Sequence, residues 1–119
     1  MSLTRVFNSS EFMQPSDNEP IRSVVSESTD AIIVAWYVKP GQKIPPHTHP
    51  NGQDTWTILS GEGQYYLDQN GSTKKITAGD IVVARTNDVH GVLNITDQPL
   101  IFVSVVCPPD AGYHLLAEA

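Results

Sequence analysis

The chain has 119 residues, enough for one hydrophobic core and too few for two, so we expect a single domain over residues 1–119. Its net charge of -6, with only 7 Lys and Arg, argues against a nucleic-acid-binding protein, because phosphate contacts need a basic face. One cysteine cannot form an internal disulfide. Without an apolar run of about 18 residues or a basic leader, we expect a soluble, cytoplasmic protein that does not contact membranes.

The N-terminal segment, residues 1–20, is polar and contains a predicted turn at residues 15–18. Its apolar residues are too few to build a core of their own; they are Val6, Phe7, Phe12 and Met13. We therefore expect this segment to pair at an edge of the domain or to bury these side chains in a homodimer interface.

Residues 31–38 form a nearly continuous apolar run that is rich in β-branched and aromatic side chains and ends at Pro40-Gly41. This pattern predicts a buried strand. Pro45 and Pro46 follow. Because proline lacks an N–H group, we expect them to be extended but to lie outside any central strand ladder.

Residues 54–59 alternate, which places Asp54, Trp56 and Ile58 on an inward face. A carboxylate among apolar neighbours needs a cation to stay charged. Further short strands are predicted at regular spacing, separated by turns; they are residues 64–68, 73–76, 81–84, 91–95 and 100–106. No helical period is longer than residues 113–117, so the predicted fold class is all-β.

His47 and His49 lie two residues apart on an extended segment, so their imidazoles point to one face and can converge on one ion. Asp54 follows after a turn, and His90 stands at the start of another apolar strand. Imidazole with carboxylate suits Zn, Fe, Mn, Ni or Cu. We expect one divalent transition metal held by these four residues, with the Gln53 amide oxygen as the alternative to Asp54; the inward face favours Asp54.

These residues stand in two motifs that resemble those of the cupin family. The first cupin motif is Gly, five residues, His-x-His, three or four residues, Glu, six residues and Gly. The chain is similar to it through Gly41, His47, His49 and Gly61, and Asp54 takes the position of the Glu.

The second cupin motif is Gly, five residues, Pro-x-Gly, two residues, His, three residues and Asn. The chain is similar to it through Gly79, His90 and Asn94. It departs from the motif at Arg85, in the Pro position, and at Asn87, in the second Gly position. Because Asn tolerates left-handed backbone angles, we expect the corner at residue 87 to form.

The resemblance implies a small antiparallel β-barrel or jelly roll, also called a double-stranded β-helix, with the metal inside and a dimeric assembly. It also implies a metal-dependent enzyme acting on a small polar metabolite, of the dioxygenase, isomerase, decarboxylase or lyase type. The alternatives are a non-catalytic module that binds a sugar or small acid, and a metal that only supports the fold. Arg85 is either a surface charge or a carboxylate clamp at the mouth.

Overall fold

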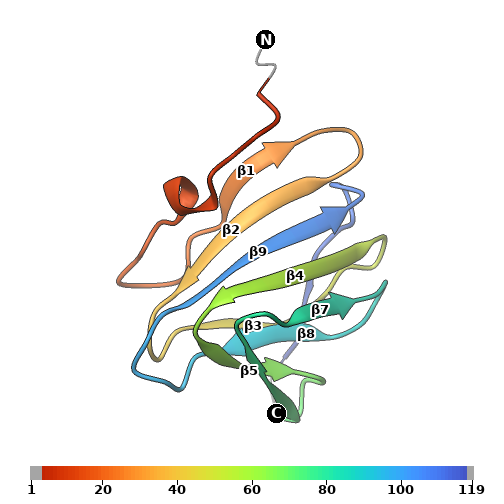
Figure 1. Cartoon of the computed structure of the whole chain (residues 1–119). Helices are drawn as coiled ribbons and strands as arrows, with labels where there is room; N and C mark the ends of the chain where they lie inside the picture. Colours follow the sequence, from red (N-terminus) through yellow and green to blue (C-terminus); the bar gives the residue numbers. More distant parts are fainter. Residues whose placement is uncertain (1–3, 118–119) are drawn as a thin grey trace.

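Two five-stranded antiparallel sheets pack face to face in the computed structural model, which describes residues 4–117 (Figure 1). The first sheet has the order β1-β2-β9-β4-β7, with β1 (Ser23–Glu27), β2 (Ile32–Val38), β9 (Leu100–Cys107), β4 (Gln53–Ser60) and β7 (Ile81–Ala84). The second has the order β10-β3-β8-β5-β6, with β10 (His114–Leu115), β3 (Lys43–Thr48), β8 (His90–Leu93), β5 (Glu62–Tyr66) and β6 (Thr73–Thr77). The all-β class and the jelly-roll arrangement are confirmed, and the two sheets face each other without closing into a barrel.

The core lies between the sheets and follows the predicted alternation. In β4, Asp54, Trp56 and Ile58 are buried while Thr57 and Leu59 are exposed. The Trp56 ring stacks on Phe102 of β9 at a centroid distance of 4.2 Å. Burial of such large aromatic side chains supplies much of the hydrophobic stabilisation, at about 25 cal/mol per Å² of apolar surface.

The two prolines are the clearest departure from the sequence-based expectation. Pro45 and Pro46 lie inside β3, which has β10 on one side and β8 on the other. The register with β8 shifts by one residue between Ile44 and His47, so the prolines form a bulge that needs no ladder N–H. Gly91 of β8 makes room for it, since a Cβ there would lie 2.5 Å from the Ile44 carbonyl oxygen.

Both ends of the described chain differ from the expectations. Residues 113–117, the longest stretch with a helical period, contain the short strand β10 instead. β1 and the 3-10 helix η1 (Ser9–Phe12) were not predicted. Within residues 4–117, no helix is long and apolar enough to cross a membrane.

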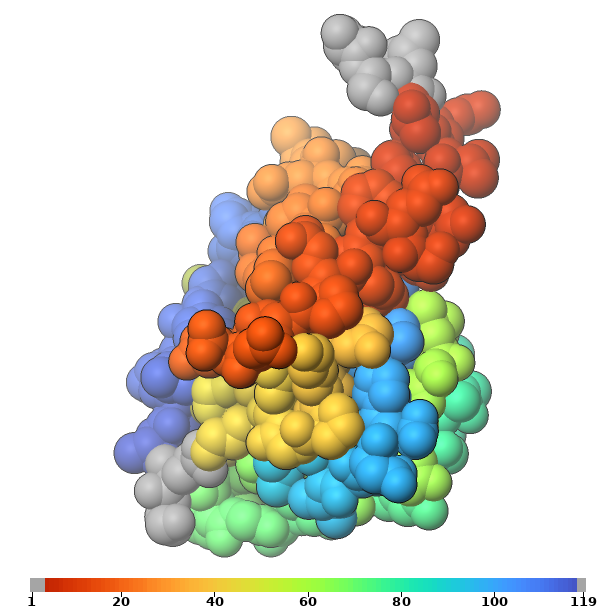
Figure 2. Space-filling model, turned by 90° about the vertical axis from the view of Figure 1, so that its left-hand side faces the viewer, coloured from red at the N-terminus to blue at the C-terminus, as the bar shows by residue number. Residues whose placement is uncertain are grey.

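The first three residues of the predicted N-terminal segment lie outside the described part. Residues 14–22, here named the N-terminal strap, lie against the segment that joins β2 to β3 (Figure 2). The Gln42 side-chain amide donates to the carbonyl oxygens of Ser16 (2.7 Å) and Asn18 (2.6 Å), and Lys39 forms a 2.6 Å ion pair with Asp17. These contacts hold the strap beside the opening between the sheets.

Candidate metal centre

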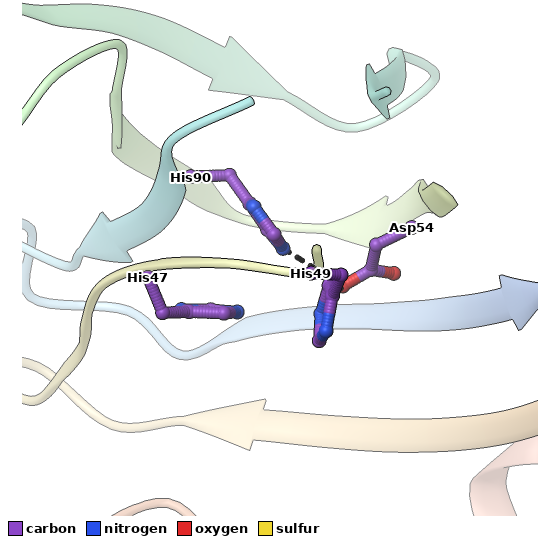
Figure 3. Close-up of side chains that lie close together, drawn as sticks. All are labelled: His47, His49, Asp54 and His90. Carbon is purple, nitrogen blue, oxygen red and sulfur yellow. Dashed lines mark hydrogen bonds and ion pairs between the residues drawn. The ribbon is translucent and has the colours of Figure 1, made fainter. Parts of the chain in front are cut away.

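The structure brings together all four predicted ligands. His47 lies in β3, His49 just after it, Asp54 in β4 and His90 at the start of β8, and their side chains point toward one another (Figure 3). One ligand atom from each residue lies within 4.8 Å of the others. Gln53 is exposed, and its amide donates to Thr55 Oγ1 at 3.2 Å, so it stays outside this group.

The backbone explains why these side chains meet. His47 and His90 are direct cross-strand partners in the second sheet, so their side chains lie on the same inner face. Asp54 comes from the first sheet, where its buried position faces the opposite layer. The group therefore spans the interior between the two sheets.

Each imidazole is fixed through its Nδ1 atom. Nδ1 lies 2.8 Å from the Pro45 carbonyl oxygen in His47, 2.6 Å from that of Gly112 in His49, and 3.1 Å from that of Asp88 in His90. A carbonyl oxygen only accepts, so Nδ1 carries the hydrogen in all three rings. Nε2 is thereby left as the ligand atom, as in metal-binding histidines oriented by a second hydrogen bond.

The Asp54 carboxylate lies close to three polar side chains. Its Oδ2 lies 3.1 Å from His90 Nε2 and 3.4 Å from His49 Nε2, while Ser104 Oγ donates to Oδ1 at 2.5 Å. Burial raises the pKa of this carboxyl, but the contacts with His49, His90 and Ser104 outweigh burial and hold the pKa below its ordinary value. Asp54 thus presents a negative charge to the three imidazoles.

The pKa values of His47 and His49 are shifted in opposite directions. Burial, followed by the charge of His90, lowers the pKa of His47 to about 4, which favours the neutral imidazole that binds metals. Burial also lowers the pKa of His49, but its contacts with the Asp54 carboxylate and the Gly112 carbonyl outweigh that effect and raise it. Of these two histidines, His49 is therefore the one at which protons compete more strongly with a metal ion.

The donor set fits a first-row divalent ion. Metal–nitrogen distances of about 2.1 Å allow two ligand atoms on one ion to lie up to about 4.2 Å apart. The ligand atoms lie within 4.8 Å of one another, so the most widely separated pair would have to move closer by less than about 1 Å to bind one ion. Three imidazoles and one carboxylate suit Zn, Fe, Mn, Ni and Cu, and four ligands leave two positions open on an octahedral ion.

A cavity of about 890 Å³ opens onto this group. His47, His49 and Asp54 line it, and so does Tyr113, whose ring stacks on His47 at a centroid distance of 4.8 Å. Tyr113 was not identified from the sequence as a residue of the site. It belongs to the C-terminal segment, which has a weak helical pattern and contains no metal-binding motif.

Two other residues singled out in the sequence lie elsewhere. Arg85 is exposed and does not line the cavity, so the structure places it as a surface charge. Asn94 is fully buried and joins the β2 end to the β8–β9 turn, donating to the carbonyl oxygens of Val38 (3.0 Å) and Gln98 (2.8 Å). It supports the fold and is absent from the ligand group.

The sequence profile described as Cupin domain matches residues 34–106, more than half of the chain and all four candidate ligands. The chain belongs to the cupin family. A double-stranded β-helix protein from Klebsiella pneumoniae subsp. pneumoniae has 49% identity and a TM-score of 0.91, covering 98% of this chain and 99% of that one. An RmlC-like cupin from Desulfovibrio desulfuricans has 28% identity and a TM-score of 0.78, covering 89% and 98%.

A curated relative, germin-like protein 5-1 from Oryza sativa subsp. japonica, is 28% identical over 87 residues. The match covers 69% of this cupin but only 38% of the rice protein, so the chain spans less than half of that relative. The cupin match also leaves the N-terminal strap and Tyr113 outside residues 34–106.

Proposed function

We propose that this cupin is a metal-dependent enzyme that acts on a small polar metabolite, with the ion bound by His47, His49, Asp54 and His90. The observation that carries the proposal is the alignment of three imidazoles, each fixed through Nδ1 with Nε2 directed to one point, beside a charged carboxylate.

The cavity favours a catalytic over a purely structural ion. A structural zinc site closes its tetrahedron and has no need of an adjoining space, whereas this group adjoins about 890 Å³. That volume suits a small metabolite bound against largely apolar walls with a few directed polar groups.

The residues of the chain supply orientation and exclusion of water. Ser104 holds one oxygen of Asp54 by donating to it, so the other oxygen faces His49 and His90. The Tyr113 ring covers one face of His47 and narrows access to it. When bound, the ion would act as a Lewis acid toward a carbonyl or carboxylate oxygen, or support oxygen chemistry if it is redox-active.

The test begins with protein purified without a metal-affinity step, because that step introduces nickel. Elemental analysis should find near one divalent ion per chain. The loaded protein is then incubated with panels of small carboxylates and sugars, and products are followed by NMR. Turnover of a small metabolite that a chelator abolishes supports the enzyme. Ligand binding without turnover would instead make the protein a binding or sensing cupin.

A further inference from the structure

The N-terminal strap forms part of the cavity wall. Asn18, Glu19, Pro20 and Arg22 line the cavity together with the candidate ligands. The strap is fixed by the contacts of Gln42 and Lys39, and by the Gln14 amide, which donates to Ser23 Oγ at 2.9 Å. The strap precedes the cupin match, so this part of the wall lies outside the region that the family profile covers.

Arg22 is the strap's cation, and it lines the same cavity as His47, His49 and Asp54. Among residues 4–117, no ion pair or side-chain hydrogen bond joins the Arg22 guanidinium to another group. Arg22 is exposed, so its five N–H donors are available to a ligand in the cavity.

The other basic residues considered either have a polar partner or lie outside the cavity. Lys39 is paired with Asp17, Lys43 has a partner, and Arg85 lies outside the cavity. Two carboxylates also line the cavity. Asp54 already contacts His49, His90 and Ser104. The negative charge of Glu19 helps to raise the pKa of Tyr113, and no ion pair joins Glu19 to Arg22 among the described residues.

A large part of the cavity wall that includes Arg22 and the candidate ligands is apolar. Ile32, Val34, Trp36 and Val106 come from the inner faces of β2 and β9. A ligand that fills this cavity needs an apolar body and two kinds of polar group: oxygen donors for the metal ligand group and an anion for Arg22.

We propose that the ligand is a small amphipathic carboxylate whose carboxylate binds Arg22 while its apolar body lies against β2 and β9 and its opposite, oxygen-bearing end reaches the histidine group. The contact between the ligand's oxygen-bearing end and the histidine group rests on the proposed metal centre, whereas the contact with Arg22 does not depend on it. A guanidinium binds a carboxylate through two parallel hydrogen bonds, which gives Arg22 a role in specificity that glutamine cannot take over.

The experiment uses catechol probes, which chelate divalent ions, in two pairs of nearly equal shape: 3,4-dihydroxybenzoate with 3,4-dihydroxybenzamide, and 3,4-dihydroxyphenylacetate with 3,4-dihydroxyphenylacetamide. Dissociation constants are measured by calorimetry on the full-length, zinc-loaded protein. The variants are Arg22→Gln and, as the matched control on an exposed arginine outside the cavity, Arg85→Gln. Zinc content is determined in the same samples.

We expect the wild type and Arg85→Gln to favour the carboxylate of at least one pair by about 10-fold. Arg22→Gln should abolish that preference while leaving the affinity of the uncharged catechol and the zinc content unchanged. Equal affinities within both pairs in the wild type, or a preference that persists in Arg22→Gln, would overturn the role of Arg22. Loss of zinc from the wild type would instead count against the metal centre, and the ratio within each pair, measured without zinc, would still decide the Arg22 contact.

Discussion

His90 Nε2 and Asp54 Oδ2 lie 3.1 Å apart, although they come from opposite sheets and are 36 residues apart in the sequence. This contact connects the two layers at a buried point, where an unpaired carboxylate would be costly. Both residues belong to the candidate ligand group, whose members are the subject of the first three predictions.

Removal of an imidazole should lower metal occupancy sharply. His47→Ala or His90→Ala leaves the ion with an open, wet position, and we expect most of the metal to be lost after dialysis. Elemental analysis of the dialysed proteins measures this. His114→Ala is the control, because His114 is exposed in β10 and outside the ligand group. Full occupancy in both ligand variants would exclude this metal centre.

The fourth ligand is tested by comparing adjacent residues. Asp54→Ala should weaken metal affinity by about 10-fold or more, whereas Gln53→Ala should change it little, since only Asp54 faces the interior. Ser104→Ala should have an intermediate effect because Ser104 orients the carboxylate without binding the ion. Competition with a metal-binding dye gives the affinities. The reverse order for residues 53 and 54 would transfer the role to Gln53.

The stability of the metal-free protein should depend on pH with opposite signs at His47 and His49. The pKa of His47 is about 4 when folded and 6.5 in the reference state, so the unfolded chain binds more protons between these values. Its contribution to the free energy of unfolding, up to about 3 kcal/mol, is present above pH 6.5 and is lost as pH falls toward 4. The raised pKa of His49 makes its contribution largest at low pH, lost as pH rises through the folded value.

Urea unfolding at several pH values separates the two histidines. His47→Gln should flatten the loss of stability between pH 6.5 and 4, whereas His49→Gln should remove the loss of stability that occurs above pH 6.5, as pH rises through the raised pKa of His49. Because His49 gains a proton at a higher pH than His47, metal affinity should also fall as pH drops through the raised pKa of His49. Identical slopes in both variants would contradict the assigned protonation states.

Much of the site was predictable because its signals are local. The period of two in residues 54–59 placed Asp54 inward and Gln53 outward, as observed. The left-handed corner expected at Asn87 is also present, with a φ of 67°. These features depend on neighbouring residues in the chain, which sequence patterns describe directly.

The remaining features depend on partners distant in the sequence. Pro45 and Pro46 could enter β3 only because Gly91 of β8 accepts the bulge. Tyr113 reaches His47 because β10 pairs with β3, a contact of two residues that no periodic pattern marks. Arg22 became a cavity residue only through the strap's contacts with Gln42 and Lys39.

The predicted homodimer rests on apolar surface that the described chain leaves exposed. In the N-terminal segment, Val6 is 88% exposed, and Phe7 packs edge-on against Phe12 at 6.0 Å without reaching the core clusters. A second uncharged surface lies on the outer face of the first sheet, where the cross-strand neighbours Val105, Thr55 and Val83 continue into Val103, Thr57 and Ile81. Apolar surface of this kind is commonly buried between subunits.

We expect a dimer whose interface includes Val6, Phe7, Phe12 and Met13. Light scattering at micromolar concentration should give about twice the chain mass of 13.0 kDa, and a value near 13.0 kDa would reject the dimer. Deletion of residues 1–13 leaves the strap intact and should shift the protein toward monomer. If the truncated protein remains dimeric, the interface lies elsewhere, and Ile81→Lys on the outer face of β7 becomes the deciding variant. A lysine there places a charge on each copy of a self-complementary surface, so it should dissociate a dimer formed through that sheet and leave one formed through the N-terminal residues intact.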